Sequence, residues 1–572
     1  MKETIQFYFS KKTTKIIILI LVGFLLYLNV LHSPLFWDDY DGILHNFYIQ
    51  NWAYWPKFFS ENLIAGAGLL SDYWRPMILV IFSLGWHLWQ DNPVGYHLIN
   101  IIFHISNALL LFFILRKILK KETPAFLIAL VFLIHPVQTE AVSYVSGIGD
   151  PLSAFFVLLS TYFFINLLEK GKIKFLIVSI FCYIFSLMSK ETAIITPAIM
   201  FLIGLPYIKV QKIQFRKIII YLLPFFIVAL VYFGLRLTVL NFKNTLNLYN
   251  EENLFTKRID IRLLTFFKTL PFYFNFMFMP IDLYMERQIA IPKSIFDPLV
   301  LLGIFIFAII VFLLIKYFNK DYIFSLGILW FLVALFPMSN ILIPVSGLIY
   351  EHWLYLPLIG IFLSLFWIME KLLKQYQLEK IGVIVLIIFL IFLSIRTVIR
   401  NLDWRDPVYF YQQIIEHNPT SYRIWNNLGI EAEKQNKILL AEQAYKEATK
   451  IDSQNPIAYH NLGVLYYSKI GDYQKAESYL KQAIEKDKTF FYSYIFLAKI
   501  YWEQKELNKA KEILEAYLTI GSRADIYFIL SQIYKGEGNI KQSFDYIQKV
   551  LELDPLNNLY QKEFDLLKQL QK

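Results

Sequence analysis

Two adjacent carboxylates, Asp38 and Asp39, follow directly after the first long apolar run of the chain. A carboxylate held at a membrane surface can act as a general base and take the proton from an attacking hydroxyl group. The run before them covers residues 15–31 and carries no charge after Lys15. At about 1.5 Å per residue it reaches ~25 Å, close to the thickness of a hydrocarbon core. The pair is therefore expected at a membrane surface.

Further ionisable residues are predicted on the same face. Glu140 ends an apolar stretch beside His135, where a charge is costly unless it is paired or functional, and Asp150 follows it. The candidate cations are Arg75, Lys190, Arg258, Arg262, Arg287 and His352. Transfer of a sugar from a polyprenyl phosphate to a hydroxyl needs a base, cations for the departing phosphate and exclusion of water. The carboxylates could meet the first of these needs and the cations the second.

Each candidate also has a structural explanation. Acidic residues just beyond a span are most often solvated helix ends, Arg75 could anchor an interfacial helix, and Lys190 could simply pair with Glu191. No group of residues has the spacing of metal ligands, and the histidines in apolar runs favour packing over metal binding. The sequence predicts no cofactor, and a divalent metal has no support from it.

The composition indicates a polytopic membrane protein. Of the 572 residues, 57% are hydrophobic, 18% are aromatic and only 17% are charged. The net charge of +10 lies in short basic clusters between apolar runs, as in cytoplasmic loops, so nucleic-acid binding is not expected. The only cysteine, Cys182, lies within an apolar run, which excludes a disulfide.

The basic clusters predict a topology. Lys2, Lys11, Lys12 and Lys15 precede the first run, which is expected to remain as an anchor with a cytoplasmic N-terminus. Eleven spans follow, near residues 15–32, 96–115, 124–142, 151–168, 174–189, 193–208, 218–236, 298–316, 322–338, 352–370 and 381–399. The stretches 75–90 and 264–281 are expected to lie in the outer interface. An odd number of spans places the C-terminus outside.

The composition changes after residue 400 to a soluble pattern with a repeat. Trp425, Leu428 and Gly429 recur as Tyr459, Leu462 and Gly463 at a spacing of 34, which is typical of tetratricopeptide repeats. The chain is thus predicted to be all-α: a membrane domain over 1–400, a linker over 401–420, and an α-solenoid over 421–572 with about four repeats and a capping helix.

The chain resembles the transmembrane and tetratricopeptide-repeat containing protein family and its bacterial relatives, which belong to the GT-C superfamily of integral-membrane glycosyltransferases. The similarity covers nearly the full length. It rests on the order and spacing of six segments: Phe36-Trp-Asp-Asp-Tyr-Asp-Gly-Ile43 with Asn46, Tyr73-Trp-Arg-Pro76, Gly95-Tyr-His-Leu-Ile-Asn100, His135-Pro-Val-Gln-Thr-Glu-Ala-Val142, Ser189-Lys-Glu-Thr-Ala193 and Glu351-His-Trp-Leu-Tyr-Leu-Pro357.

The resemblance implies inverting transfer from a lipid-phosphate sugar on the outer leaflet, with Asp38 or Asp39 as the base and Glu140 as an acid of the second loop. Arg75, Lys190 and the pair Glu351 and His352 would then bind the donor phosphate or shape the site, and His135, Asp150 and Tyr355 would also belong to it. The chain has Ile148 and His352 where relatives often have arginine. Arg258, Arg262 and Arg287 could replace those cations.

The sequence therefore predicts a glycosyltransferase of a bacterial inner membrane that uses a polyprenyl-phosphate sugar, mannosyl-like, for protein O-glycosylation or an envelope glycan. Its outward-facing repeats would present the acceptor protein or glycan. Two alternatives stay open. An O-antigen ligase or oligosaccharide polymerase would carry its key residues in one late outer loop, and a non-enzymatic repeat scaffold would give no reason for carboxylates of separate loops to converge.

Overall fold

The computed structural model describes residues 12–210, 213–238, 254–345, 347–555 and 557–571, so the predicted N-terminal lysines Lys2 and Lys11 lie outside the described residues. Throughout these ranges the regular secondary structure is helical, as the sequence predicts. Contacts divide the chain into two units, Met1–Phe410 and Tyr411–Lys572. The residues predicted as a linker, 401–420, contain the end of α17, Glu379–Asp403, and the whole of α18, Pro407–His417.

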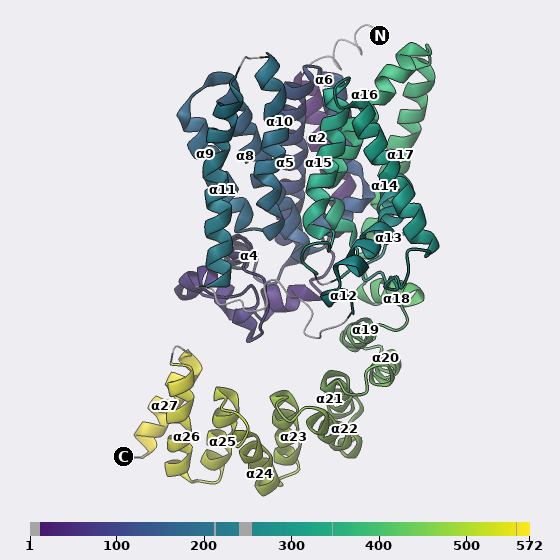
Figure 1. The fold of residues 1–572 in the computed structure, drawn as a ribbon. Helices are drawn as coiled ribbons and strands as arrows, with labels where there is room; N and C mark the ends of the chain where they lie inside the picture. Colours follow the sequence, from purple (N-terminus) through teal and green to yellow (C-terminus); the bar gives the residue numbers. More distant parts are fainter. Residues whose placement is uncertain (1–11, 211–212, 239–253, 346, 556, 572) are drawn as a thin grey trace. The chain divides into compact units, whose positions relative to one another are not determined.

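The first unit is a bundle of long helices (Figure 1). Its longer helices are α2 (Lys12–Tyr27), α4 (Pro76–Trp89), α5 (Pro93–Leu119), α6 (Glu122–Ile134), α8 (Gly149–Lys170), α9 (Ile173–Leu187), α10 (Thr196–Val210), α11 (Phe215–Leu237), α13 (Ile259–Phe278), α14 (Pro298–Tyr317), α15 (Tyr322–Leu335), α16 (Pro357–Gln375) and α17 (Glu379–Asp403). Short helices lie between them: α3 (Phe47–Gln50), α7 (Thr139–Val142) and α12 (Leu254–Lys257). The segment between α2 and α4, drawn in purple, gathers with α4 at one end of the bundle.

Seven helices of the described ranges are long and apolar enough to cross a membrane, or eight if a bent pair counts as one span. The unit is therefore that of an integral membrane protein. Two of the eleven predicted spans, 174–189 and 322–338, coincide with shorter apolar helices, and 352–370 corresponds to α16. The predicted number of eleven spans thus stays a prediction.

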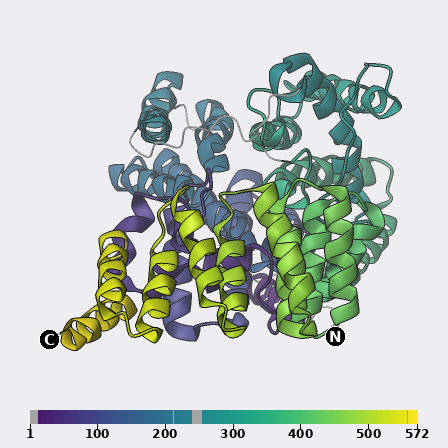
Figure 2. The same ribbon diagram turned by 90° about the horizontal axis from the view of Figure 1, so that it is seen from below.

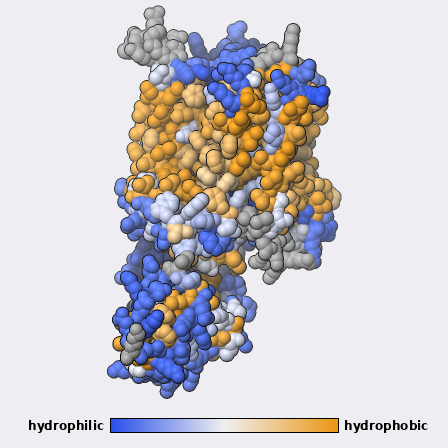
Figure 3. All heavy atoms as spheres, turned by 90° about the vertical axis from the view of Figure 1, so that its left-hand side faces the viewer, coloured by the Kyte–Doolittle hydropathy of each residue, from blue (hydrophilic) through white to orange (hydrophobic). Residues whose placement is uncertain are grey.

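The surface of this unit carries a broad apolar band between two hydrophilic ends (Figure 3). Outer and inner helices of the bundle differ in burial: 11% of the apolar stretch of α17 is buried, against 72% of the apolar stretch within Val145–Lys170, the span that contains α8. Apolar helices with exposed faces suit contact with lipid chains, whereas α8 belongs to the protein core. The site described below lies at one hydrophilic end of the bundle, where the N-terminal end of α8 meets other segments.

Local sequence signals set the helix ends. Asn92 accepts a hydrogen bond from the backbone of Val94 at the start of α5, where Pro93 takes the first helical position. Gly171 ends α8 with a φ of +64°, a conformation that favours glycine.

The predicted span 124–142 is not one straight helix. His135 and Pro136 interrupt it, and the two parts, Glu122–Ile134 and Pro136–Val142, meet at 52°. The interruption follows from the proline, which favours an extended residue before it; His135 has a ψ of 127°. The break turns α7 and Glu140 away from the axis of α6.

The second unit consists of antiparallel helix pairs that stand side by side (Figure 2). The pairs are α19 (Tyr422–Lys434) with α20 (Ile438–Ile451), α21 (Pro456–Leu465) with α22 (Tyr473–Lys486), α23 (Phe491–Glu503) with α24 (Leu507–Leu518), and α25 (Ala524–Gly536) with α26 (Ile540–Leu553). A final helix, α27, covers Asn558–Leu570. Close packing explains the repeated small residues: a side chain at Gly429 would lie 2.3 Å from the ring of Tyr445.

Candidate active site

The two adjacent aspartates differ in environment. Asp39 is 1% exposed, and its carboxylate accepts hydrogen bonds from the Phe36 amide at 3.1 Å and from the amide and hydroxyl of Ser146 at 2.8 and 2.5 Å. Burial raises the pKa of Asp39 to about 7 in spite of these bonds. Its contacts tie the first connecting segment, residues 31–75, to the segment before α8.

Asp38, in contrast, is exposed. Its backbone amide donates a hydrogen bond to the hydroxyl of Tyr144 at 3.0 Å. Trp37, just before it, has a φ of +60°, an unusual conformation for a bulky residue, and a short π-helix follows at Tyr40–Leu44. This backbone turns the two carboxylates into different surroundings.

Glu140 is buried and paired. Its carboxylate accepts hydrogen bonds from the backbone amide of His352 at 2.9 Å and from the ring Nδ1 of His352 at 2.8 Å. The exposed fraction is 1% for the Glu140 side chain and 22% for that of His352. Glu140 therefore holds the short helix η9, Glu351–Leu354, and only the imidazole reaches an open surface.

Glu351 forms a second buried pair behind His352. Its carboxylate lies 3.6 Å from a terminal nitrogen of Arg400, which also donates to Asp403 at 2.8 Å through its other terminal nitrogen. Neither carboxylate oxygen of Glu351 has a hydrogen-bond partner among the described residues. Burial raises the pKa of Glu351 above its ordinary value, against the lowering effect of Arg400.

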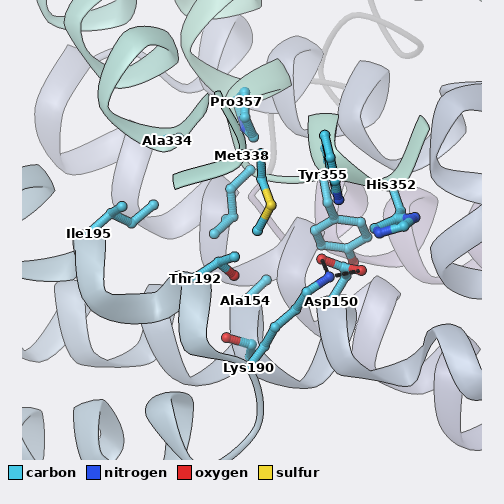
Figure 4. A pocket seen from close by; sticks show the side chains of 13 residues that line it. Asp150, Ala154, Lys190, Thr192, Ile195, Ala334, Met338, His352, Tyr355 and Pro357 are labelled. Atoms are coloured by element: carbon cyan, nitrogen blue, oxygen red, sulfur yellow. Dashed lines mark hydrogen bonds and ion pairs between the residues drawn. The ribbon is translucent and has the colours of Figure 1, made fainter. Parts of the chain in front are cut away.

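A small pocket brings predicted site residues of distant segments together (Figure 4). It is lined by Asp150, Ser153, Ala154, Lys190, Thr192, Ile195, Ala334, Met338, His352, Trp353, Tyr355, Leu356 and Pro357. The ammonium group of Lys190 reaches both oxygens of Asp150, at 2.8 and 2.7 Å. Lys190 is 6% exposed, so this is a nearly buried ion pair at the first turn of α8.

A second ion pair lies near the first. Arg75 donates two hydrogen bonds to Glu191, at 3.1 and 2.7 Å, and its guanidinium lies over the ring of Tyr73. The suggested pairing of Lys190 with its neighbour Glu191 is therefore wrong, because the extended backbone at Lys190 sends the two side chains to different partners. Both cations border Gly149: its ideal Cβ position is 3.8 Å from Arg75 Nη1 and 3.8 Å from Lys190 Cδ.

The three arginines suggested as replacement cations contact other groups, and none of them lines the pocket. Arg258 pairs with Asp260 at an exposed position. Arg262 donates to the carbonyls of Ile341 and Thr256. Arg287 donates to Asp282 and stacks on Tyr284, with its guanidinium carbon 3.7 Å from the ring centre.

The remaining predicted residues support the walls of the site. Tyr355 lines the pocket with its ring, and its hydroxyl contacts His104 at 2.7 Å and accepts from Asn107 at 3.0 Å. His135 is fully buried; one ring nitrogen contacts the carbonyl of Met277 and the other accepts from the amide of Val137. His135 thus joins the break after α6 to α13.

Several contributors escaped the sequence reasoning. Ser146 and Tyr144 hold the first connecting segment, and Arg400, directly after the predicted span 381–399, pairs with Glu351. An arginine at the end of an apolar run is a sequence signal that could have identified Arg400, because such a charge requires a partner when it is buried. The two hydroxyl residues carry no comparable signal. Within the described ranges no group of three or more potential ligands could hold a metal ion.

Comparisons with known proteins support this arrangement of parts. Residues 75–234 match the family model "Dolichyl-phosphate-mannose-protein mannosyltransferase", and residues 434–469, 471–525 and 524–555 match models of tetratricopeptide repeats. The match to the first model covers α4 through most of α11 and therefore contains both ion pairs, Arg75 with Glu191 and Lys190 with Asp150.

Curated relatives include protein O-mannosyl-transferase F38B6.6 of Caenorhabditis elegans, 27% identical over 77% of this chain and 63% of the relative. Protein O-mannosyl-transferase TMTC3 of Mus musculus is 23% identical over 69% of this chain and 46% of its own length. The chain thus spans between about half and two thirds of these relatives. Among solved structures, MamA is 23% identical over 25% of this chain and 85% of its own, with a TM-score of 0.23.

Proposed function

We propose that this chain, a homologue of the TMTC protein O-mannosyl-transferases, is a GT-C-type membrane glycosyltransferase that moves a sugar from a polyprenyl-phosphate donor to an acceptor hydroxyl. The observation that carries the proposal is the pocket in which Lys190, Asp150, His352 and Tyr355 come together. These residues come from three separate segments. Their convergence supports an enzyme more than a scaffold.

Lys190 is the proposed ligand of the donor phosphate. An ammonium group has three donors, and Asp150 uses two of them, which leaves one for a phosphate oxygen. The pocket lies at the N-terminal end of α8, a 22-residue helix whose dipole favours an anion. Arg75 stands beside Lys190 across Gly149, and His352 offers the imidazole at the pocket wall. We assign no phosphate contact to Arg258, Arg262 or Arg287.

Asp38 is the proposed base. It is exposed, whereas the carboxylate of Asp39 is buried and already accepts three hydrogen bonds. A base must be reachable by the acceptor, and Asp38 meets this requirement. Asp39 and Glu140 then have structural roles: Asp39 fixes the first connecting segment on Ser146, and Glu140 orients His352.

The reaction follows from these assignments. Asp38 takes the acceptor proton while the acceptor oxygen forms a bond to the anomeric carbon of the sugar. The bond between that carbon and the phosphate oxygen breaks, and both its electrons stay on the polyprenyl phosphate. Lys190 stabilises the negative charge that develops there. Attack opposite to the leaving phosphate inverts the anomeric configuration.

The relatives' names favour mannose as the sugar and a protein as the acceptor. We place the site and the repeats on the outer face of a bacterial inner membrane, with the repeats presenting the acceptor. This orientation follows from the basic clusters on the opposite ends of the predicted spans. Protease added to intact spheroplasts should remove the repeats; full protection of residues after 410 would contradict the orientation.

Turnover of a radiolabelled polyprenyl-phosphate mannose by the purified chain in liposomes tests the function. An extract of acceptor proteins from the same membrane is the acceptor, and a sugar linked to polyprenyl pyrophosphate is the control donor. Label is expected to reach protein hydroxyls from the monophosphate donor alone. Transfer of a preassembled glycan from the pyrophosphate donor would favour the ligase alternative, and no transfer from either donor would favour the scaffold.

A further inference from the structure

The C-terminal end of α17 contacts the ends of α2 and α6 and the residue that follows α7. Two of its residues, Thr397 and Asn401, form side-chain hydrogen bonds with different segments of the site. Thr397 donates to the carbonyl of Ile134 at 2.6 Å, and Asn401 accepts from Ser143 at 2.7 Å and donates to the carbonyl of Leu26 at 2.9 Å. This end of α17 is therefore anchored to the end of α2 and to the segment around α7.

Trp404, directly after α17, adds contacts of its indole ring. It is fully buried, and it stacks on Tyr144 with ring centres 5.4 Å apart and an angle of 18° between the planes. It also contacts Phe36 at 6.0 Å and Phe410 at 4.7 Å. Through these ring contacts, Trp404 joins the C-terminal end of α17 to the first connecting segment.

The partner of this stack holds the backbone of the base. The hydroxyl of Tyr144 accepts the hydrogen bond of the Asp38 amide at 3.0 Å. Phe36, which also touches Trp404, gives its amide to the carboxylate of Asp39. Removal of the Trp404 ring would leave a void beside both groups that fix the backbone on either side of the base.

We propose that Trp404 is a positioning residue for the base Asp38, acting through Tyr144. The inference rests on the proposed function, since it concerns the same reaction. It assigns a role in the site to a residue within the stretch 401–420, which the sequence alone marks as a linker. A misplacement of about 1 Å at a reacting group can lower the rate by about 10²-fold, so support of this kind matters for turnover.

Two substitutions separate the ring from the hydrogen bond. Tyr144→Phe keeps the stacked ring and removes the acceptor of the Asp38 amide, whereas Trp404→Ala removes the stack. Trp404→Phe is the conservative rescue. The indole N–H of Trp404 has no hydrogen-bond partner among the described residues, so the substitution removes no hydrogen bond. Trp55→Ala is the matched control at a position that is 57% exposed.

The first measurement is independent of activity. Hydrogen exchange of peptides that begin at or before residue 36 and extend through residue 44 includes the Asp38 amide. Loss of one hydrogen bond should speed its exchange by up to about tenfold in Tyr144→Phe. Trp404→Ala should do the same, and Trp404→Phe and Trp55→Ala should exchange like the wild type. Unchanged exchange in Tyr144→Phe would overturn the proposal, even if Trp404→Ala fails to fold.

The second measurement is the split between kcat and KM. Misplacement of the base should lower kcat in Trp404→Ala and Tyr144→Phe by about 10- to 100-fold and leave the donor KM unchanged, with recovery in Trp404→Phe. A kcat within twofold of the wild type in both variants would overturn the positioning role. If the wild type itself transfers no sugar, the proposed function fails, and the exchange measurement still decides whether Trp404 fixes the Asp38 backbone.

Discussion

Replacement of Lys190 by methionine should separate stability from donor binding. The side chain of Lys190 is 7% exposed and that of its partner Asp150 is 13% exposed, so Lys190→Met leaves a nearly buried carboxylate without its cation. Breaking a buried pair from one side costs about 3–5 kcal/mol of folding free energy. Loss of one charge-assisted hydrogen bond to the phosphate costs a further 1.5–3 kcal/mol or so of donor binding, which corresponds to a donor KM about 10- to 100-fold higher.

The double variant Lys190→Met with Asp150→Asn distinguishes the two effects. Asparagine removes the uncompensated charge, so the thermal midpoint in detergent should return most of the way to that of the wild type. The donor KM should stay high, since the phosphate ligand is still missing. Asp150→Asn alone releases two donors of Lys190 and should lower the donor KM.

The assay is thermal unfolding together with initial rates over a range of polyprenyl-phosphate sugar concentrations. Lys57→Met is the matched control, because its ion pair with Glu61 is exposed and such pairs contribute little. It should change neither quantity. A donor KM that recovers along with stability in the double variant would refute the phosphate role of Lys190 and leave it a purely structural pair.

Three further predictions concern other parts of the molecule. Burial raises the pKa of Asp39 from 3.8 to about 7, so between these pH values the folded chain retains a proton that the unfolded chain has lost. The contribution of Asp39 to folding stability is therefore full below pH ~4 and should be lost as the pH rises to about 7. Asp39→Asn should flatten this pH dependence of the thermal midpoint. A Cβ at Gly147 would lie 2.7 Å from the carbonyl oxygen of Glu140, so Gly147→Ala should lower the thermal midpoint, whereas Gly234→Ala, with open space around it, should not. Removal of residues 421–572 should spare transfer to a small soluble acceptor and impair transfer to a protein; equal loss for both would contradict acceptor presentation by the repeats.

Much of the fold follows from patterns that need no tertiary information. The 34-residue recurrence of small and aromatic residues predicts the helix pairs of the second unit, and apolar length predicts most long helices of the first. Short helices such as α9 and the break at His135 are harder, because a proline and neighbouring helices decide whether an apolar run continues. Apolar length alone also leaves open whether α16 is a span.

The sequence named some of the residues that line the pocket, and it did not show how they pair. The sequence named Lys190, Asp150, His352 and Tyr355, which the fold brings to one pocket. It could not show that Lys190 pairs with Asp150 and Glu191 with Arg75, because these contacts depend on how α4, α8 and α10 pack. The distinction between Asp38 and Asp39 likewise depends on Ser146, more than a hundred residues away.

The proposed base gives the most direct test of the account. Asp38→Asn keeps the shape of the side chain and removes the proton acceptor, so kcat for transfer from a radiolabelled polyprenyl-phosphate sugar should fall by about 10²- to 10⁴-fold. Donor binding, measured with the same purified variant, should barely change. Asp39→Asn should retain far more activity than Asp38→Asn. Turnover at the wild-type rate by Asp38→Asn would contradict the assignment of Asp38 as the base. A larger loss of kcat in Asp39→Asn than in Asp38→Asn, when both variants are equally well folded, would contradict it as well.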